Sequence, residues 1–124
     1  MQHIEIINQT HPFRKPFEAR NCTSFMCRLR GLMFTRSIGQ YEGLLMVQPV
    51  QDRINAAIHM FFMNYDIAVV WINRDMQVVD VQLARRWHPA YTPAKPALYV
   101  LETHPDRLRD FKIGDQVTFV KCAD

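Results

Sequence analysis

One stretch carries the clearest structural signal in the chain, Ile67-Ala68-Val69-Val70-Trp71-Ile72-Asn73-Arg74-Asp75-Met76-Gln77-Val78-Val79-Asp80-Val81-Gln82-Leu83. Its first seven residues are mostly β-branched or aromatic, which predicts a strand. From Gln77 onward, positions 79, 81 and 83 alternate with positions 78, 80 and 82, which predicts a second strand. The four residues Asn73-Arg74-Asp75-Met76, where the two strands meet, predict a tight hairpin turn. This turn is imperfect, because Met76 stands where a glycine would ease a positive φ.

Further strands are predicted on both sides of this hairpin, over residues 3–8, 43–47, 59–63, 97–102 and 116–121. Pro49 is expected to end the second of them. A short helix is predicted at Phe25–Arg30, capped by Thr23 or Ser24 and ended by Gly31, and a single helical turn is predicted at Pro105–Phe111. The pattern predicts a mainly β (α+β) fold, an antiparallel barrel or sandwich of about seven strands with one or two short helices.

Length and composition favour one globular domain over residues 1–124. The chain is 48% hydrophobic and carries a formal net charge of +3. That apolar content excludes disorder, and a chain of this length can bury a core without help from metals or disulfides. The modest positive charge by itself does not indicate a strongly anionic partner.

No membrane segment or secretion signal is expected. Residues 1–8 alternate and include a charge, unlike the apolar stretch of a signal peptide. The most hydrophobic segment, Ile54–Ile72, contains Asn55, His59, Asn64 and Asp66, each of which would be costly in hydrocarbon. Buried strands with a polar break are therefore the favoured interpretation of this segment.

The cysteines Cys22, Cys27 and Cys122 leave an odd thiol after any pairing. There is no CxxC motif, and the spacing of the first two fits neither a zinc knuckle nor a thioredoxin-like motif. We therefore expect all three to be reduced thiols that pack as small hydrophobes, in a cytoplasmic protein.

Seven phrases follow one another in a recognisable order. They are Arg28-Leu29-Arg30-Gly31-Leu32-Met33-Phe34, Gly43-Leu44-Leu45-Met46, Ile58-His59-Met60-Phe61-Phe62-Met63, Ile67-Ala68-Val69-Val70-Trp71-Ile72, Gln77-Val78-Val79-Asp80-Val81, Tyr99-Val100-Leu101-Glu102 and Ile113-Gly114-Asp115. Together they resemble the family called domain of unknown function 192, over about residues 19–120. The resemblance implies a small, mostly β domain. It implies no established activity.

The chain departs from that family pattern in two places. Ala68 stands where the family usually has an aspartate, and Leu101-Glu102-Thr103-His104-Pro105-Asp106 replaces a usual Leu-Glu-Leu-Pro-Ala-Gly run. If the aspartate contributes to a site, this chain has lost it unless Asp66 substitutes. Positions 66 and 68 share a face if the strand begins early enough.

Motifs for catalysis are missing from the sequence. It contains no Gly-x-Ser-x-Gly elbow, glycine-rich phosphate loop or His-Glu-x-x-His helix. The acidic residues fall mostly at turns, such as Asp75 and Asp115, or at a strand end, Glu102, where solvated side chains are the favoured interpretation. No catalytic residue is predicted, and a small hydrolase or metal-using enzyme is the alternative function.

Methionine is abundant, with seven in the chain, and His59, Met60 and Met63 cluster. Thioether and imidazole ligands suit Cu(I), and Met33, Met46 and Cys27 could add to such a set. On a strand, however, Met60 would point away from the other two members of the cluster. Methionine is also ordinary core filler, so core packing is favoured and no metal or cofactor is assigned.

Nucleic acid is a further alternative. The arginines and lysines cluster loosely, and some aromatic side chains could stack on bases: Arg14, Lys15, Arg20, Arg28, Arg30, Arg36, Arg85 and Arg86, with Tyr41, Trp87 and Tyr91. Tight binding would need the basic side chains to converge on one face. A solvated surface is favoured, and nucleic acid is not expected as a partner.

The Arg85–Pro89 loop is the strongest candidate for a binding site, because loops on a rigid scaffold carry function and Arg with Trp is typical of interface hot spots. The predicted ligand-binding residues are Arg28, Arg30, His59, Arg86, Trp87 and His88. In the alternative interpretation, Trp87 closes one end of the barrel as part of the core. The predicted function is a non-enzymatic binding or accessory module. Its basic, aromatic-edged pocket would take a small anionic ligand or a protein partner. The chain would be a monomer, or a homodimer paired through an edge at Gln116–Lys121.

Overall fold

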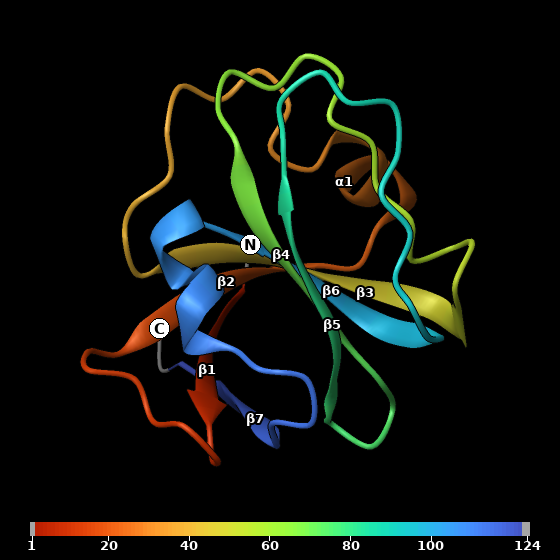
Figure 1. Ribbon diagram of the computed structural model, residues 1–124. Coiled ribbons are helices and arrows are strands. Elements are labelled where there is room, and N and C mark those ends of the chain that lie inside the picture. The colour runs from red at the N-terminus through yellow and green to blue at the C-terminus, as the bar shows by residue number, and fades with distance from the viewer. Residues whose placement is uncertain (1, 123–124) are drawn as a thin grey trace.

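The computed structural model describes residues 2–122, and within them seven strands form one sheet in the order β5-β4-β6-β3-β2-β1-β7 (Figure 1). The elements are β1 (His3–Asn8), β2 (Phe17–Cys22), α1 (Phe25–Arg30), β3 (Glu42–Asp52), β4 (Ile67–Ile72), β5 (Val78–Ala84), β6 (Ala97–Thr103), a 3-10 helix η1 (Pro105–Asp110) and β7 (Val117–Lys121). The predicted mainly β fold with short helices is confirmed. The sheet order leaves β5 and β7 at its edges, so the sheet does not close into a barrel and the fold is sandwich-like.

The predicted hairpin is confirmed as β4 and β5. All six residues of β4 are buried, as expected for a strand with neighbours on both sides. In the turn, Met76 N–H donates to Asn73 O at 3.0 Å and Asn73 N–H donates to Gln77 O at 3.0 Å. Met76 has a φ of 65°, so the positive φ foreseen at that position is present without the glycine that would ease it.

The strand predicted at residues 59–63 is wrong. Within this segment Met60 and Met63 are buried in the core, whereas Phe61 and Phe62 are exposed. Core-facing positions three residues apart fit a turning chain and not an extended one, and Phe62 takes a φ of 61° that no strand allows. Met60 and Met63 are core residues, as the favoured interpretation expected.

The structure still has seven strands, because β2 is present although the sequence did not predict it. It pairs with β3 in parallel, so the sheet is mixed and not wholly antiparallel. Parallel neighbours need a crossover connection instead of a tight turn. Here the connection is α1 with residues 31–41, which carry the chain from the end of β2 back to the start of β3.

Pro49 does not end β3, which runs on to Asp52. The register against β6 shifts between Val47, opposite Tyr99, and Asp52, opposite Ala97. Pro49 lies inside this irregularity, where the ladder does not need its missing N–H group.

The cysteine prediction is also wrong for two of the three residues. Cys22 at the end of β2 and Cys27 in α1 form a disulfide, with their Cα atoms 5.7 Å apart. Their sequence separation of five matched no familiar motif, but the turn into α1 brings the two residues together. The Cys122 thiol donates to Glu18 Oε1 at 3.7 Å.

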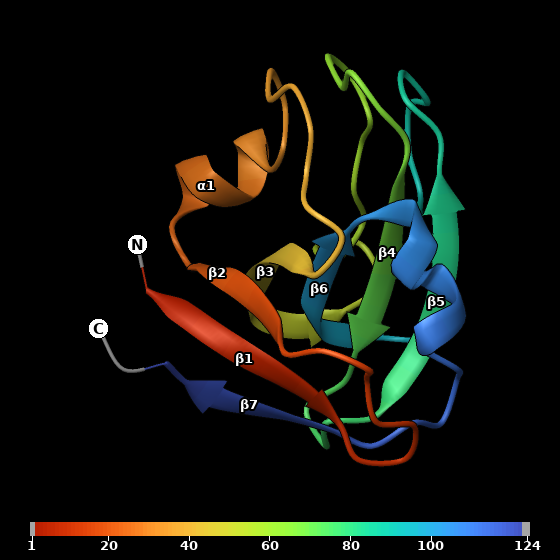
Figure 2. The same ribbon diagram turned by 90° about the vertical axis from the view of Figure 1, so that its left-hand side faces the viewer.

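Each face of the sheet has its own apolar cluster. One contains Ile6, Phe17, Leu45, Val70 and Leu101, among others. The cluster on the opposite face is built around Leu44, Met46, Val69, Trp71 and Val100, with Met60 and Met63 from the long loops packed onto it. Figure 2 shows α1 lying over the β2–β3 part of the sheet, beside the loops that cover this second face.

Asp115 was interpreted as a solvated turn residue, but it is buried. Its carboxylate accepts hydrogen bonds from Asn8 Nδ2 at 2.8 Å and from Lys112 N–H at 2.9 Å, and His11 Nδ1 lies 2.8 Å away. Burial alone would raise the pKa of Asp115, but these hydrogen bonds outweigh it and the pKa is lowered. Asp115 is thus a structural tie between β1 and the turn before β7.

None of the helices between residues 2 and 122 has the length and apolar character that a bilayer crossing requires. The predicted edge at Gln116–Lys121 lies on β7, which pairs with β1 alone among the described strands. Dimerisation through this edge stays a prediction.

Candidate ligand-binding site

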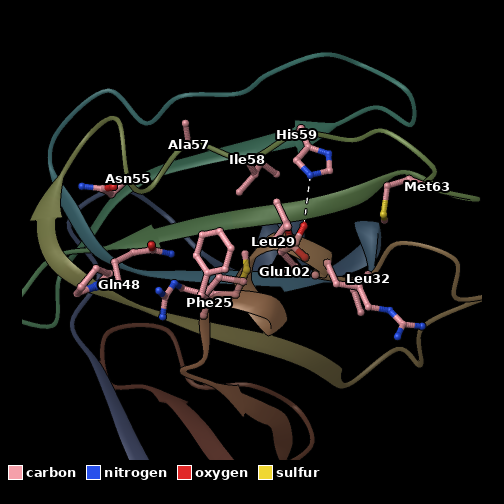
Figure 3. A pocket seen from close by; sticks show the side chains of 15 residues that line it. Phe25, Leu29, Leu32, Gln48, Asn55, Ala57, Ile58, His59, Met63 and Glu102 are labelled. Carbon is pink, nitrogen blue, oxygen red and sulfur yellow. Dashed lines mark hydrogen bonds between the residues drawn. The ribbon is translucent and has the colours of Figure 1, made fainter.

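A cavity of about 230 Å³ lies between α1, β3 and the loop at residues 55–63, and we call it the α1 pocket. Apolar side chains make much of its wall, namely Phe25, Leu29, Leu32, Met46, Ile58 and Met63. Polar groups from four parts of the chain join them, including Arg28, Arg30, Gln48, His59 and Glu102 (Figure 3). An apolar wall with a few polar groups is typical of small-molecule sites.

The helix that forms one wall is held by its ends and not by a buried face. No residue of α1 is buried. At its start, Ser24 Oγ accepts a hydrogen bond from Cys27 N–H at 3.1 Å, and at its end Gly31 N–H donates to Cys27 O at 2.8 Å. The disulfide then ties Cys27 to the end of β2. These local ties position α1 over the sheet.

Two of the predicted residues, Arg28 and Arg30, reach the pocket from α1. The Arg28 guanidinium donates to Thr23 O, and to Val47 O at 3.5 Å, which fixes its position beside β3. Arg30 is exposed, and no hydrogen bond or ion pair joins its guanidinium to another of the described residues. Arg30 therefore keeps its donors available for an anion.

His59 is the third predicted residue in the pocket, and it connects the loop to the helix. Its Nδ1 lies 3.3 Å from the donating Phe61 N–H, and its Nε2 lies 3.3 Å from Leu29 O (dashed line in Figure 3). Both contacts are satisfied by a neutral ring that carries its proton on Nε2. His59 thus closes α1 against the loop.

Glu102 is the residue whose importance the sequence did not reveal. It lies on β6 between β3 and β4, opposite Leu44 on one side and Val69 on the other. Its side chain belongs to the face that α1 covers, and the residue is only 4% exposed. The interpretation of Glu102 as a solvated strand-end residue is therefore wrong, because β6 continues to Thr103 and has a partner on each side.

No hydrogen bond or ion pair from a described residue offsets the desolvation of the Glu102 carboxyl group. No described residue donates a hydrogen bond to Oε1, although this atom is buried. Desolvation raises the pKa of Glu102 to about 7. A carboxyl in this state costs stability, and strongly perturbed acids in clefts are indicators of functional sites.

Gly31 lies directly against the Glu102 carboxyl. A Cβ placed on Gly31 would lie 3.1 Å from Glu102 Oε1, and the glycine has a φ of 52° and a ψ of −127°. Glycine is required there for two reasons, the close approach of the carboxyl and a backbone conformation that other residues rarely adopt.

A second hollow lies on the other side of α1, lined by Arg20, Met26, Cys27, Arg30, Gly31, Thr35 and Leu44. Arg20 stands opposite Leu44 in the β2–β3 ladder, and Leu44 stands opposite Glu102 in the next. The three residues form one row across the sheet, which places Arg20 about 10 Å from Glu102 by strand spacing. Arg20 was noted in the sequence only as one of several scattered arginines.

The other three predicted residues lie outside the α1 pocket. Arg86 lines a different hollow, where its backbone N–H donates to Asp66 Oδ1 at 2.9 Å. The His88 ring packs on Tyr91 with centroids 5.1 Å apart. Trp87 is 56% exposed, so the alternative interpretation of this ring as core is wrong. Arg28, Arg30 and His59 therefore line one pocket, whereas residues of the Arg85–Pro89 loop do not line it. The loop nevertheless lies next to His59, since Trp87 N–H donates to Met60 O and Met60 N–H donates to His88 O.

Trp87 belongs instead to an exposed ring cluster. Its ring meets the edge of Phe62 at 5.1 Å, and Phe62 stacks on Phe34 at 5.2 Å. All three residues have a positive φ, between 61° and 66°. Such conformations are strained for bulky side chains, so the loops hold these rings outward at a cost in backbone energy.

Asp66 does not take the place of the usual family aspartate, because that would require β4 to include residue 66. β4 begins at Ile67, so Asp66 precedes the strand, and its carboxylate is engaged with the Arg86 backbone. Ala68 itself is fully buried between β5 and β6. Among residues 2–122, no group of three or more His, Cys, Asp or Glu side chains is arranged to hold a metal ion.

The fold and the pocket define a small mixed-sheet domain with one short helix placed over the sheet. Residues 6–119 match the family DUF192, described as "Uncharacterized ACR". The chain belongs to this family of domains of unknown function 192, as the sequence phrases indicated.

Two relatives from species of Thermococcus cover most of this chain. A UPF0127 protein of Thermococcus kodakarensis is 35% identical over 121 residues, covering 96% of this chain and 75% of the relative. A UPF0127 protein of Thermococcus gammatolerans is 41% identical over 98 residues, covering 77% of this chain and 62% of its own length. The chain thus spans less than the whole of these relatives.

Two solved structures have the same fold. One, from Sinorhizobium meliloti 1021, is described as a candidate transcription regulator; it superposes with a TM-score of 0.82 at 16% identity and covers 95% of this chain and 92% of its own. The other, a protein of unknown function from Novosphingobium aromaticivorans, has a TM-score of 0.76 at 22% identity, with coverage of 94% and 83%. At these identities the likeness shows the fold alone.

Proposed function

We propose that the chain is a non-enzymatic binding or accessory module, and that the α1 pocket holds a small anionic ligand. The observation that carries the proposal is the position of Arg28 and Arg30 at an apolar cavity. Two permanent cations beside a partly desolvated wall attract a carboxylate or phosphate more strongly than the same cations on an open surface.

The pocket also limits the size of the ligand. Its volume of about 230 Å³ lies below the roughly 300–1,000 Å³ that is common for drug-sized ligands. The apolar wall from Leu32, Met46 and Ile58 favours an organic anion with a short hydrocarbon part over a bare inorganic ion.

The test is a ligand-observed NMR titration with isocaproate, a branched aliphatic carboxylate of suitable size. We expect saturable binding that weakens about tenfold or more when Arg28 and Arg30 are both changed to glutamine. Arg74→Gln combined with Arg109→Gln is the matched control, because this pair also removes two charges and neither residue lines the pocket. Equal weakening by the control, or no binding by the native chain, would contradict the proposal.

A protein partner is the second candidate, and the exposed ring cluster of Phe34, Phe62 and Trp87 supports it. Aromatic side chains with Arg85 and Arg86 beside them have the composition of an interface hot spot. A photo-cross-linking residue at position 62, used in the source cell, should give a discrete product that Trp87→Ser removes. A product that survives this substitution would exclude the cluster.

The cytoplasmic location rested on three reduced thiols. The disulfide between Cys22 and Cys27 removes that support, because disulfides persist mainly in oxidising compartments. A cytoplasmic location therefore stays a proposal, and the disulfide argues against it.

A further inference from the structure

We propose that Glu102 receives an ammonium group, so that the α1 pocket selects small zwitterions that carry both a carboxylate and an amine. This inference rests on the proposed function, because it assigns the carboxylate end of the same ligand to Arg28 and Arg30.

The Glu102 carboxyl is buried and lacks a hydrogen-bond donor among the described residues. It lines the pocket, it is 96% buried, and Oε1 accepts no hydrogen bond from a described residue. Carboxylates in protein interiors are normally paired with a cation or with several donors. Glu102 is therefore a wall residue of the pocket whose carboxyl the chain itself leaves without a donor at Oε1.

No cationic side chain of the described residues forms an ion pair with Glu102. The sheet row places Leu44 between Glu102 and Arg20, about two strand spacings or 10 Å apart. The pKa of Glu102 is raised to about 7 by desolvation, and no neighbouring cation lowers it. A ligand ammonium would supply the missing positive charge.

The acidic and basic residues of the pocket come from different elements of the fold. Glu102 comes from the central part of the sheet, whereas Arg28 and Arg30 come from α1 above it. Glu102 and Leu29 both line the pocket together with apolar side chains (Figure 3). A zwitterion with an aliphatic side chain satisfies the acceptor below, the guanidinium donors above and the apolar wall between them.

The experiment compares three ligands that share one branched aliphatic skeleton. L-leucine has both charged groups, isocaproate lacks the amine, and isoamylamine lacks the carboxylate. Calorimetric or NMR titrations of the native chain should rank L-leucine tightest, by about tenfold over isocaproate, because a charge-assisted hydrogen bond is added.

Two variants assign that preference to Glu102. Glu102→Gln keeps the shape and removes the charge, and Glu102→Met removes the acceptor as well. We expect both to bind L-leucine and isocaproate with nearly equal affinity, whereas Glu42→Gln, a change at an exposed glutamate of β3, retains the native preference. Circular dichroism melting curves confirm that each variant is folded.

The outcomes separate this inference from the proposed function. Binding of isocaproate without any preference for L-leucine overturns the zwitterion inference and leaves the anion pocket in place. No binding of any of the three ligands overturns both. A preference for L-leucine that survives Glu102→Met overturns the assignment to Glu102.

Discussion

The Glu102 side chain is the clearest departure from what folding alone requires. A leucine or methionine at the centre of a sheet face would be more favourable than a carboxyl with an unpaired oxygen. Its raised pKa makes the cost depend on pH. Between the ordinary value of 4.5 and the folded value of about 7, the folded chain holds a proton that the unfolded chain has lost.

We therefore predict that stability falls as pH rises through that window and is level above it, as far as Glu102 contributes. The shift corresponds to about 3 kcal/mol in the free energy of unfolding. Glu102→Gln should match the native chain near pH 4 and exceed it by about this amount at pH 8. Urea unfolding at both pH values measures the difference. A difference that does not vary with pH would contradict the burial of this carboxyl.

Gly31 offers a second test at the level of a single residue. We expect Gly31→Ala to cost about 1–3 kcal/mol of stability, since the alanine must adopt a strained φ and its Cβ meets the Glu102 carboxyl. Gly114→Ala is the matched control, because Gly114 also has a positive φ, of 96°, but no atom lies within 4 Å of its added Cβ. Denaturant unfolding should show the larger loss at Gly31, and only Gly31→Ala should weaken ligand binding. Equal losses of stability and binding would mean that backbone strain alone accounts for Gly31.

Among the elements, α1 depends most on local ties, because it buries none of its own residues. We predict that changing Cys22 and Cys27 together to serine lowers the free energy of unfolding by about 2 kcal/mol, as loop closure by a short disulfide implies. Amide hydrogen exchange of residues 25–31 should accelerate, whereas β4 should keep its protection. Unchanged exchange in α1 would show that the cap and His59 suffice to hold the helix.

The elements also show what sequence patterns can and cannot predict. The β4–β5 hairpin and α1 were predictable because their signals are local: alternation, a turn, a capping serine and a closing glycine. β2 was missed although Phe17 and Ala19 alternate with Glu18 and Arg20, because alanine is a weak apolar signal. The segment at residues 59–63 misled for the opposite reason, since its continuous apolar run contains two outward-facing phenylalanines.

For the whole molecule, the order of the strands decides what the sequence could not show. Glu102 ends an apolar strand and looks like a solvated residue until β6 is known to lie between β3 and β4. Arg28, Arg30 and His59 line one pocket, because α1 and the residue 55–63 loop cover the same face; that they bind a ligand stays a prediction. Arg86, Trp87 and His88 were grouped with them on composition alone, and the path of their loop takes them elsewhere.

The unpaired Glu102 carboxyl buried beneath α1 is the central feature of the domain. The most direct measurement is an NMR pH titration of the side-chain carboxyl carbon of Glu102 in the ligand-free chain, assigned with Glu102→Gln. We predict a midpoint at about 7, because desolvation raises the pKa of this group. A midpoint near the ordinary value of 4.5 would mean that Glu102 is solvated or already paired, and would contradict the burial of an unpaired carboxyl and the zwitterion selectivity that depends on it.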